Sequence, residues 1–232
     1  ESPLPSHDDP EELCNRMADF FTQKIKIIHD GLAELQKQPF DLDKDADFPG
    51  SDDQCLSEFD DVSEKDIEKI IRNFASKSCI LDPIPTHLVK QCLDLLVPLI
   101  TRIVNKSFAT ATVPTSFKLA AVTPILKKAN LIADILKNFR PISNLPFVSK
   151  VLEKAASTQL LSHKDRHGLR EKFQSAYREW HSTETALLRI HHDILQALDN
   201  KQCVYMTMLD LSAAFDTVSH EKLLCRMTTS LG

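Results

Sequence analysis

The sequence is poor in glycine and contains no long apolar run. Only 4 of its 232 residues are glycine, against 12 prolines, which excludes a glycine-rich or low-complexity chain. No stretch approaches the roughly 18 consecutive apolar residues of a membrane-spanning helix, so we expect no membrane segment. The first nine residues have neither a basic start nor an apolar centre, so no secretory signal is expected. The composition, 42% hydrophobic and 26% charged, is ordinary for a globular chain of one or two domains.

Cysteine pairs of the kind that bind zinc are also missing. None of the 6 cysteines forms a Cys-x-x-Cys pair, and a chain of this size needs no disulfides. We expect buried free thiols at the three cysteines that lie within apolar patterns: Cys79, Cys92 and Cys203. Two histidine pairs, His163 with His167 and His191 with His192, have no Cys or carboxylate at ligand spacing. We therefore expect both pairs to lie on the surface.

The charge is divided unevenly along the chain. Residues 1–66 carry 19 acidic and 6 basic side chains, a net charge of −13, whereas residues 67–232 carry 14 and 22, a net charge of +8. An acidic leader therefore precedes a basic body. A basic body could follow a phosphate backbone, but an ordinary solvated surface gives the same composition. The charge alone leaves nucleic-acid binding open.

Helices account for most of the predicted secondary structure. Apolar residues recur at helical spacing in six stretches: 10–35, 63–74, 88–108, 146–162, 182–198 and 218–227. Ser63 and Asp66 resemble a capping box at the start of the second helix, and Pro98 is expected to kink the third. Between the first two helices, the charged stretch 41–53 is rich in turn formers and predicts a linker.

Two stretches have the pattern of strands. Alternating apolar residues over 118–128 predict a strand that ends in the basic pair Lys127 and Lys128. The continuous apolar run 203–209 predicts a buried strand with Asp210 at its end. Between them, 138–146 contains two prolines and is expected to be a loop.

Asp210 is the first candidate for chemistry. A carboxylate at a strand end stands on a rigid platform and could hold a divalent metal ion. Aspartate in this position also commonly caps the following turn. From the residues around it alone, both roles stay open.

Six segments of the chain, taken in order, resemble the reverse transcriptase of non-LTR (LINE) retrotransposons of the CR1/jockey type. They are KSCILDPIP at 77–85, VTPILKK at 122–128, NFRPISNL at 138–145, FQSAYR at 173–178, STETAL at 182–187 and LDLSAAFDTV at 209–218. Any one of them is a weak signal. Six in the same order, over about residues 63–231, are specific.

The resemblance implies an α+β fold, a partial right-hand polymerase rich in helices. Residues 1–62 would be an acidic helical leader and linker, and 63–232 a partial reverse transcriptase domain. Within it, the fingers would span about 63–200 and the start of the palm about 201–232. The implied reaction is RNA-templated addition of dNTPs to a DNA 3′ end by two-metal chemistry with Mg²⁺. The implied partners are an RNA template, a DNA primer and dNTPs, in the nucleus or cytoplasm of a cell.

Specific residues take roles from this resemblance. Asp210 would be catalytic and would bind metal together with the backbone carbonyl of Leu211. Phe215 would pack against the nucleotide sugar, and Arg140 and Arg178 would supply cations to the nucleotide, since guanidinium binds phosphate bidentately. Contacts with the nucleic-acid backbone would come from three lysines: Lys127, Lys128 and Lys150. For each of the three lysines, plain solvation is an equal alternative.

The sequence departs from the family at two points. Trp180 stands where relatives commonly have glycine or another small residue. The second metal motif, an aromatic-x-Asp-Asp, is not found after Asp216, so we expect this chain to be a fragment that is inactive on its own. The alternative is a non-catalytic RNA-binding or protein-interaction remnant of such an enzyme.

Overall fold

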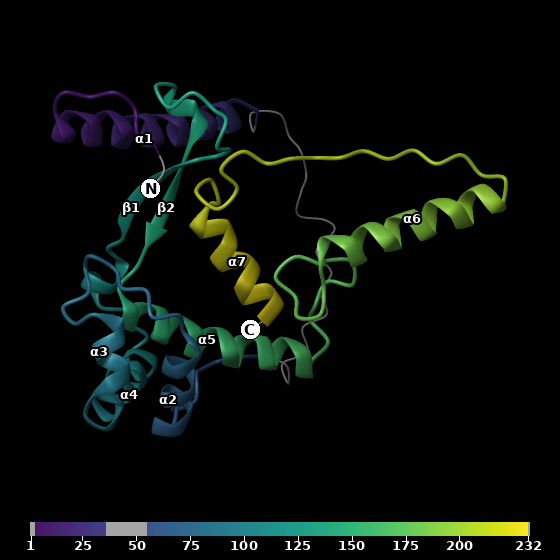
Figure 1. Cartoon of the computed structure of the whole chain (residues 1–232). Coiled ribbons are helices and arrows are strands. Elements are labelled where there is room, and N and C mark those ends of the chain that lie inside the picture. The colour runs from purple at the N-terminus through teal and green to yellow at the C-terminus, as the bar shows by residue number, and fades with distance from the viewer. Residues whose placement is uncertain (1–2, 36–54, 232) are drawn as a thin grey trace.

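The computed structural model describes residues 3–35 and 55–231, which form helices and one small sheet (Figure 1). The elements are α1 (Pro10–Leu35), α2 (Glu64–Asn73), α3 (Thr86–Gln91), α4 (Leu93–Ala109), β1 (Ala121–Leu126), β2 (Phe139–Asn144), α5 (Phe147–Arg166), α6 (Thr183–Asp199) and α7 (His220–Leu231). The expected α+β class with a high helix content is thus confirmed. The linker predicted at 41–53 lies outside the described residues. No helix in the described part of the chain has both the length and the apolar character to cross a membrane.

The largest core lies among α2, α3, α4 and α5, at the lower end of the molecule in Figure 1. Helix α4 is central to it because α2, α3 and α5 all pack against it. The buried residues of this core are Ile67, Ile71, Val89, Leu93, Val97, Ile100, Val104, Phe147, Val151, Leu152 and Ala155. The apolar spacing read from the sequence predicted the buried faces of α2 and α5. The apolar stripe predicted over 88–108 was wrong for α4, because its Leu95 and Leu99 are 79% and 55% exposed. The face of α4 that is buried carries Val97 and Ile100 instead.

Side-chain caps set the start of two helices. The hydroxyl oxygen of Ser63 accepts a hydrogen bond from the backbone N–H of Asp66 at the start of α2, as the sequence predicts. At α6, Ser182 and Thr185 form a reciprocal capping box. Each cap satisfies backbone N–H groups that have no partner inside the helix.

The long helix predicted over 88–108 is broken earlier than expected. Helix α3 ends at Gln91 and α4 begins at Leu93, with Cys92 between them at φ −111° and ψ 37°. Pro98 lies within α4, only five residues after its first residue. Proline removes one hydrogen bond and crowds the carbonyl four residues before it, here that of Asp94. Placing the break at Cys92 keeps this defect close to the helix start.

Strands β1 and β2 form an antiparallel hairpin with Ala121 opposite Asn144 and Leu126 opposite Phe139. The loop predicted at 138–146 was therefore wrong, since most of it is β2. Two prolines fit into this hairpin because hydrogen-bonded and non-hydrogen-bonded residue pairs alternate along antiparallel strands. The N–H of Lys127 donates to the carbonyl of Asn138, so Pro124 and Pro141 face each other at a position where backbone N–H groups would point outward.

Helix α1 packs across the far end of this hairpin (Figure 1). Leu13 and Met17 of α1 are buried against Leu126 of β1 and Phe139 of β2. Just before the helix, the backbone N–H and the hydroxyl of Ser6 donate to the same carboxylate oxygen of Asp134, at 2.8 and 2.7 Å. The acidic leader thus places a helix directly on the basic body.

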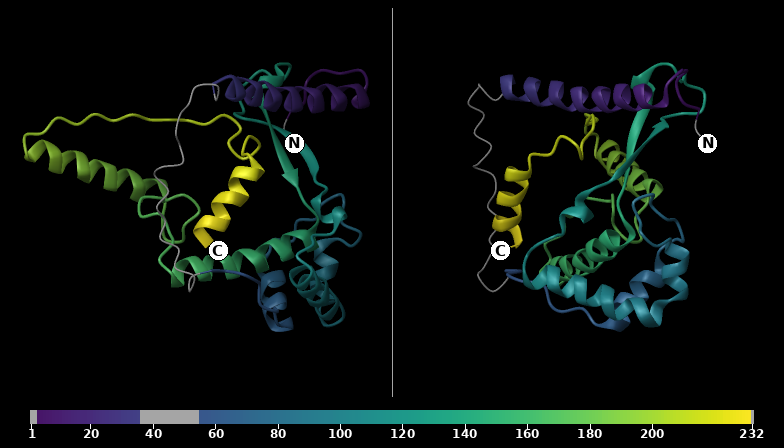
Figure 2. Two further views of the ribbon diagram at one scale, coloured as in Figure 1. Left: turned by 180° about the vertical axis from the view of Figure 1, so that it is seen from behind. Right: turned by 90° about the vertical axis from the view of Figure 1, so that its left-hand side faces the viewer.

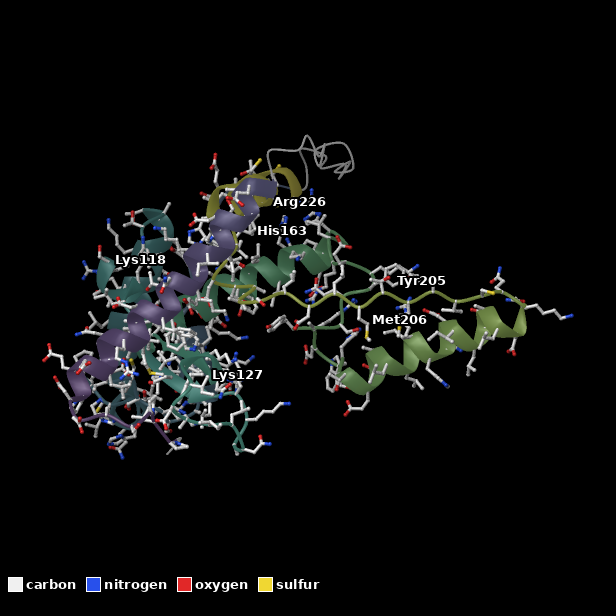
Figure 3. The ribbon with its side chains drawn as sticks, turned by 90° about the horizontal axis from the view of Figure 1, so that it is seen from above. Lys118, Lys127, His163, Tyr205, Met206 and Arg226 are labelled. Carbon is white, nitrogen blue, oxygen red and sulfur yellow. The ribbon has the colours of Figure 1, made fainter. Side chains whose placement is uncertain are left out.

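Helix α6 and residues 200–211, which we call the arm, project away from the other helices (Figure 2). The strand predicted at 203–209 was wrong: this segment has no strand partner among the described residues, and all of 201–210 is exposed. Figure 3 shows Tyr205 and Met206 on this segment, outside the cluster of helices. A strand needs a neighbour to pair its N–H and C=O groups, and apolar composition alone supplies none.

Two expectations about burial also need correction. The six cysteines, all in the described part of the chain, form no disulfide, but only Cys79 is buried, while Cys92 and Cys203 are exposed. His163 is buried rather than on the surface, and its ring centroid lies 4.6 Å from that of His167. His191 and His192 are exposed, as expected. Membership of an apolar stripe predicts burial only where a neighbouring element covers that stripe.

Candidate nucleotide-binding site

The segment 77–85 fixes the junction between the hairpin and α5. The Asp82 carboxylate accepts the backbone N–H of Cys79 with one oxygen and that of Phe147, the first residue of α5, with the other, both at 2.6 Å. The Cys79 thiol donates to the carbonyl of Asn144 at 3.2 Å. A carboxylate that accepts backbone N–H groups at a helix start is stabilised by the helix dipole. Segments 77–85 and 138–145 therefore support one another structurally.

The segment after Asp210 folds into a tight turn. Ala213 has φ 52°, in the left-handed region, and its carbonyl accepts the backbone N–H groups of Asp216 and Thr217 at 2.9 and 3.1 Å. The Thr217 hydroxyl donates to the same carbonyl at 3.1 Å. Three donors on one carbonyl hold the turn closed, and the turn brings Phe215 and Asp216 back toward the hairpin.

A cavity of about 440 Å³ lies where this turn meets α1 and the hairpin. It is lined by Phe20, Phe21, Lys24 and Ile25 of α1, by Lys127, Phe139, Arg140 and Pro141 at the hairpin, and by 212–216 of the turn. Three cations and one carboxylate, Asp216, thus share a lining with several aromatic rings. A cavity of this size and composition suits a small anionic ligand with a flat ring.

Three of the sequence-predicted site residues meet at this cavity: Lys127, Arg140 and Phe215. The ammonium of Lys127 donates to the carbonyl of Lys137 at 2.7 Å, which leaves it charged and with further donors. The side chain of Arg140 is exposed and has no hydrogen-bond or ion-pair partner among the described residues. An unpaired guanidinium is free to bind a phosphate.

The other predicted residues lie elsewhere. Asp210, Leu211, Lys128, Lys150 and Arg178 are not part of the cavity lining. Lys150 is half-buried and donates to the side-chain oxygen of Asn144 at 2.5 Å, so it serves the junction between β2 and α5.

Arg178 lies beside an ion pair at the end of α5. Hydrogen bonding from Arg170, with a smaller contribution from the charge of Arg178, holds the pKa of Asp165 below its ordinary value. The preceding residue, Tyr177, comes closer to the cavity, since its ring meets that of Phe215 edge to face, with centroids 6.1 Å apart. The segment 173–178 thus reaches the site through an aromatic contact rather than through its arginine.

The residues expected to hold magnesium do not form a metal site by themselves. Asp210 is exposed on the extended segment. Across residues 3–35 and 55–231, no group of three or more His, Cys, Asp or Glu side chains is arranged to hold a metal ion. Asp210 and the carbonyl of Leu211 offer fewer oxygens than the roughly six that Mg²⁺ takes.

Sequence reasoning missed the contribution of α1. No site residue was predicted in the acidic leader, yet α1 supplies one wall of the cavity. The signal was present in the spacing, since Lys24 follows Leu13 by 11 residues and Met17 by 7, which places all three on one face of the helix. The spacing does not show which surface this face of α1 packs against.

Part of the basic body of the chain is similar to known proteins. A family model described as reverse transcriptase (RNA-dependent DNA polymerase) matches residues 125–230. The chain is 29% identical over 143 residues to the RNA-directed DNA polymerase from mobile element jockey of Drosophila melanogaster, covering 62% of this chain and 16% of that protein. It is 29% identical over 153 residues to the probable RNA-directed DNA polymerase from transposon X-element of the same fly, covering 66% and 17%.

A third relative is the jockey polymerase of Drosophila funebris, 28% identical over 177 residues, or 74% of this chain and 19% of that protein. The chain therefore spans less than a fifth of the length of these curated relatives. The family match includes the end of β1, all of β2, the segment 173–178 and the turn after Asp210, which lie around the cavity. Residues 125–230 thus resemble a reverse transcriptase domain, and these relatives are polymerases of mobile elements or transposons.

Proposed function

We propose that this chain is the part of an RNA-directed DNA polymerase that receives the incoming dNTP and the template. In the complete enzyme, dNTPs would be added to a DNA 3′ end opposite an RNA template. The observation that carries the proposal is the shared lining of one cavity by Lys127, Arg140 and Phe215. Phe215 is 75 residues away from Arg140 in the sequence, and each of the three residues falls in a different family segment.

Within this proposal, residues of about 63–200 form the fingers, and the palm begins at about 201. The hairpin then acts as the fingers element that carries cations to the nucleotide, with Arg140 on β2 and Lys127 just after β1. Phe215 would pack against the sugar. The permanent charge of guanidinium suits Arg140 to a triphosphate. The setting would be the nucleus or cytoplasm of a cell.

Magnesium is part of this proposal because the reverse transcriptase family implies it as a cofactor. When bound, divalent ions lower the barrier to phosphoryl transfer by neutralising developing charge. In this chain, Asp210 and the carbonyl of Leu211 would be ligands. The residues described here have a separate task, which is to hold the nucleotide by its phosphates and sugar.

Nucleotide binding by the purified chain tests the proposal. A fluorescent dATP analogue is titrated into the wild-type chain, Arg140→Ala and Arg102→Ala, and anisotropy gives the dissociation constant. Loss of a charge-assisted contact is expected to weaken binding about tenfold in Arg140→Ala. Arg102 is exposed on α4 and is absent from the cavity lining, so Arg102→Ala should bind like the wild type. Equal affinities for the two variants would refute the assignment of this cavity.

RNA binding without catalysis is the second candidate function. It is favoured by the position of Asp210 on a fully exposed segment and by the net charge of +8 over residues 67–232. The two functions separate in a full-length polymerase that carries Asp210→Ala. The polymerase proposal expects primer extension to be lost and RNA binding kept. Undiminished extension would exclude a catalytic role for Asp210.

A further inference from the structure

Helix α1 reaches the cavity with a face that is fixed by packing. Leu13 and Met17 are each 5% exposed because they are buried against Leu126 and Phe139. Before the helix, Ser6 is hydrogen bonded to Asp134. The helix is thus held at its N-terminal half, and the next residues on the same face, two turns further along, point toward the turn at 212–216.

Lys24 is the charged residue on that face. It follows Leu13 and Met17 at helical spacing, it is half-buried, and it lines the cavity together with Phe20 and Phe21. Its ammonium has no hydrogen-bond or ion-pair partner among the described residues. A half-buried cation without a partner has lost part of its hydration, so an anion that enters the cavity would restore its interactions.

The cavity concentrates positive charge at one point. Lys24 approaches from α1, Lys127 and Arg140 from the hairpin, and Asp216 is the single carboxylate in the lining. Three cations against one carboxylate leave the cavity with a net charge of about +2. Two of the three cations, Lys24 and Arg140, are unpaired among the described residues. The rings of Phe20 and Phe21, 5.7 Å apart between centroids, add an apolar wall beside the charges.

We propose that Lys24, on the helix before the polymerase body, is a phosphate-binding residue of this cavity, with Phe20 and Phe21 as its apolar wall. The ligand is a phosphate ester, either the triphosphate of a dNTP or the backbone of a single-stranded RNA. The inference rests on the proposed function, because it uses the same cavity as Arg140. It extends the site to a helix that lies outside the residues of the family match.

Charge reversal at two neighbouring lysines tests the inference. Lys24→Glu and Lys26→Glu make the same change in net charge, but Lys26 is exposed and lies on the opposite side of α1. The two variants, Arg140→Ala and the wild-type chain are titrated with a fluorescent dATP analogue and with a short labelled single-stranded RNA. We expect Lys24→Glu to weaken binding of one of the two probes at least tenfold, with Lys26→Glu within about twofold of the wild type.

The affinities of the variants distinguish a failure of the role of Lys24 from a failure of the proposed nucleotide-binding cavity. If Arg140→Ala weakens binding and Lys24→Glu does not, the role of Lys24 is overturned and the cavity stands. If the wild-type chain binds neither probe, both are overturned. Equal weakening by Lys24→Glu and Lys26→Glu would show a long-range charge effect and also overturns the inference.

The choice of probe and one further variant, Lys24→Met, help to interpret these outcomes. The probe that responds to Lys24→Glu identifies the source of the phosphate, the dNTP or the RNA. Lys24→Met keeps the aliphatic stem and removes only the charge, so it should also weaken binding if α1 stays in place. Circular dichroism and thermal unfolding of each variant establish that α1 is still folded.

Discussion

The core around α4 and the arm present similar sequences in opposite environments. Helix α4 buries six residues, among them Val104 at 0% exposure. Helix α6 has the same length of 17 residues and a comparable mixture of leucine and isoleucine, yet none of its residues is buried. Leu187 and Leu188 are 65% and 68% exposed. Helical periodicity therefore predicts a helix with an apolar face, whereas burial depends on what lies opposite that face.

This difference bears directly on the candidate site. The cavity lies where the turn at 212–216 meets α1 and the hairpin, and α1 is packed against the hairpin. Asp210 lies at the end of the arm, where neither neighbouring strand nor core restrains it. A catalytic side chain must be held to within about half an ångström, so the proposed binding residues and the proposed catalytic residue Asp210 have different structural support.

The largest expected effect comes from truncating the core and the arm in parallel. Ile71→Ala should lower the free energy of unfolding by about 3 kcal/mol, because Ile71 is fully buried between α2 and its neighbours. Leu188→Ala should change it by less than about 0.5 kcal/mol, because that side chain is largely exposed. Urea unfolding followed by circular dichroism measures both. Similar losses would mean that the apolar face of α6 is covered in solution.

The next effect concerns the junction that links the core to the hairpin. Asp82→Ala leaves the backbone N–H groups of Cys79 and Phe147 without their carboxylate acceptor, and we expect a loss of about 2 kcal/mol. Asp94→Ala is the matched control, because Asp94 is exposed in the first turn of α4 and contributes only about 0.5 kcal/mol through the helix dipole. Thermal unfolding of the two variants compares them. An Asp82→Ala variant as stable as Asp94→Ala contradicts the structural role of segment 77–85.

A smaller effect, of opposite sign, is expected in the connection from the core to the arm. Trp180 has φ 64°, a left-handed conformation that strains any residue with a Cβ, and its side chain is 90% exposed. Trp180→Gly removes this strain but adds entropy to the unfolded chain. The net result should be a rise in the free energy of unfolding of roughly 0.5 to 1 kcal/mol. Trp180→Ala keeps the strain and should bring no gain. If alanine stabilises as much as glycine, the indole rather than the backbone is the source of the strain.

The smallest effect is a titration at the attachment of α1. Hydrogen bonds from the backbone and side chain of Ser6 lower the pKa of Asp134, so this contact is complete above about pH 4 and is lost as the pH falls further. Ser6→Ala removes the side-chain donor and should move the pKa of Asp134 upward. Carbon NMR of the labelled carboxyl group measures the midpoint. An unchanged midpoint would mean that the hydroxyl does not contact Asp134 in solution.

Sequence reasoning performed well where structure is decided locally. The start of α2 follows from Ser63 and Asp66, and that of α6 from Ser182, since a cap is made by residues three positions apart. The sequence-based prediction failed where strand formation depends on a partner that is distant in the sequence. The run 203–209 is as apolar as a buried strand, but no described segment pairs with it. Residues 139–144 contain proline and still form a strand, because β1 offers the matching register.

The site divides in the same way. Lys127, Arg140 and Phe215 were predicted from family segments, and the fold brings them to one cavity. Lys24 was not predicted, since nothing in its surroundings in the sequence shows that α1 lies across the hairpin. The roles of Lys150 and Asp82 at the junction also depend on contacts with residues that no periodicity links to them.

The facing prolines of the hairpin have a consequence for how copies of this chain meet. Pro124 and Pro141 stand opposite each other near the middle of the two strands, at positions whose N–H groups would point to the outer edges. Each outer edge therefore lacks a donor at its centre. A third strand, from another molecule, would lose a hydrogen bond on either side. The ribbon that carries Arg140 is thus protected on both edges against growth into an intermolecular sheet.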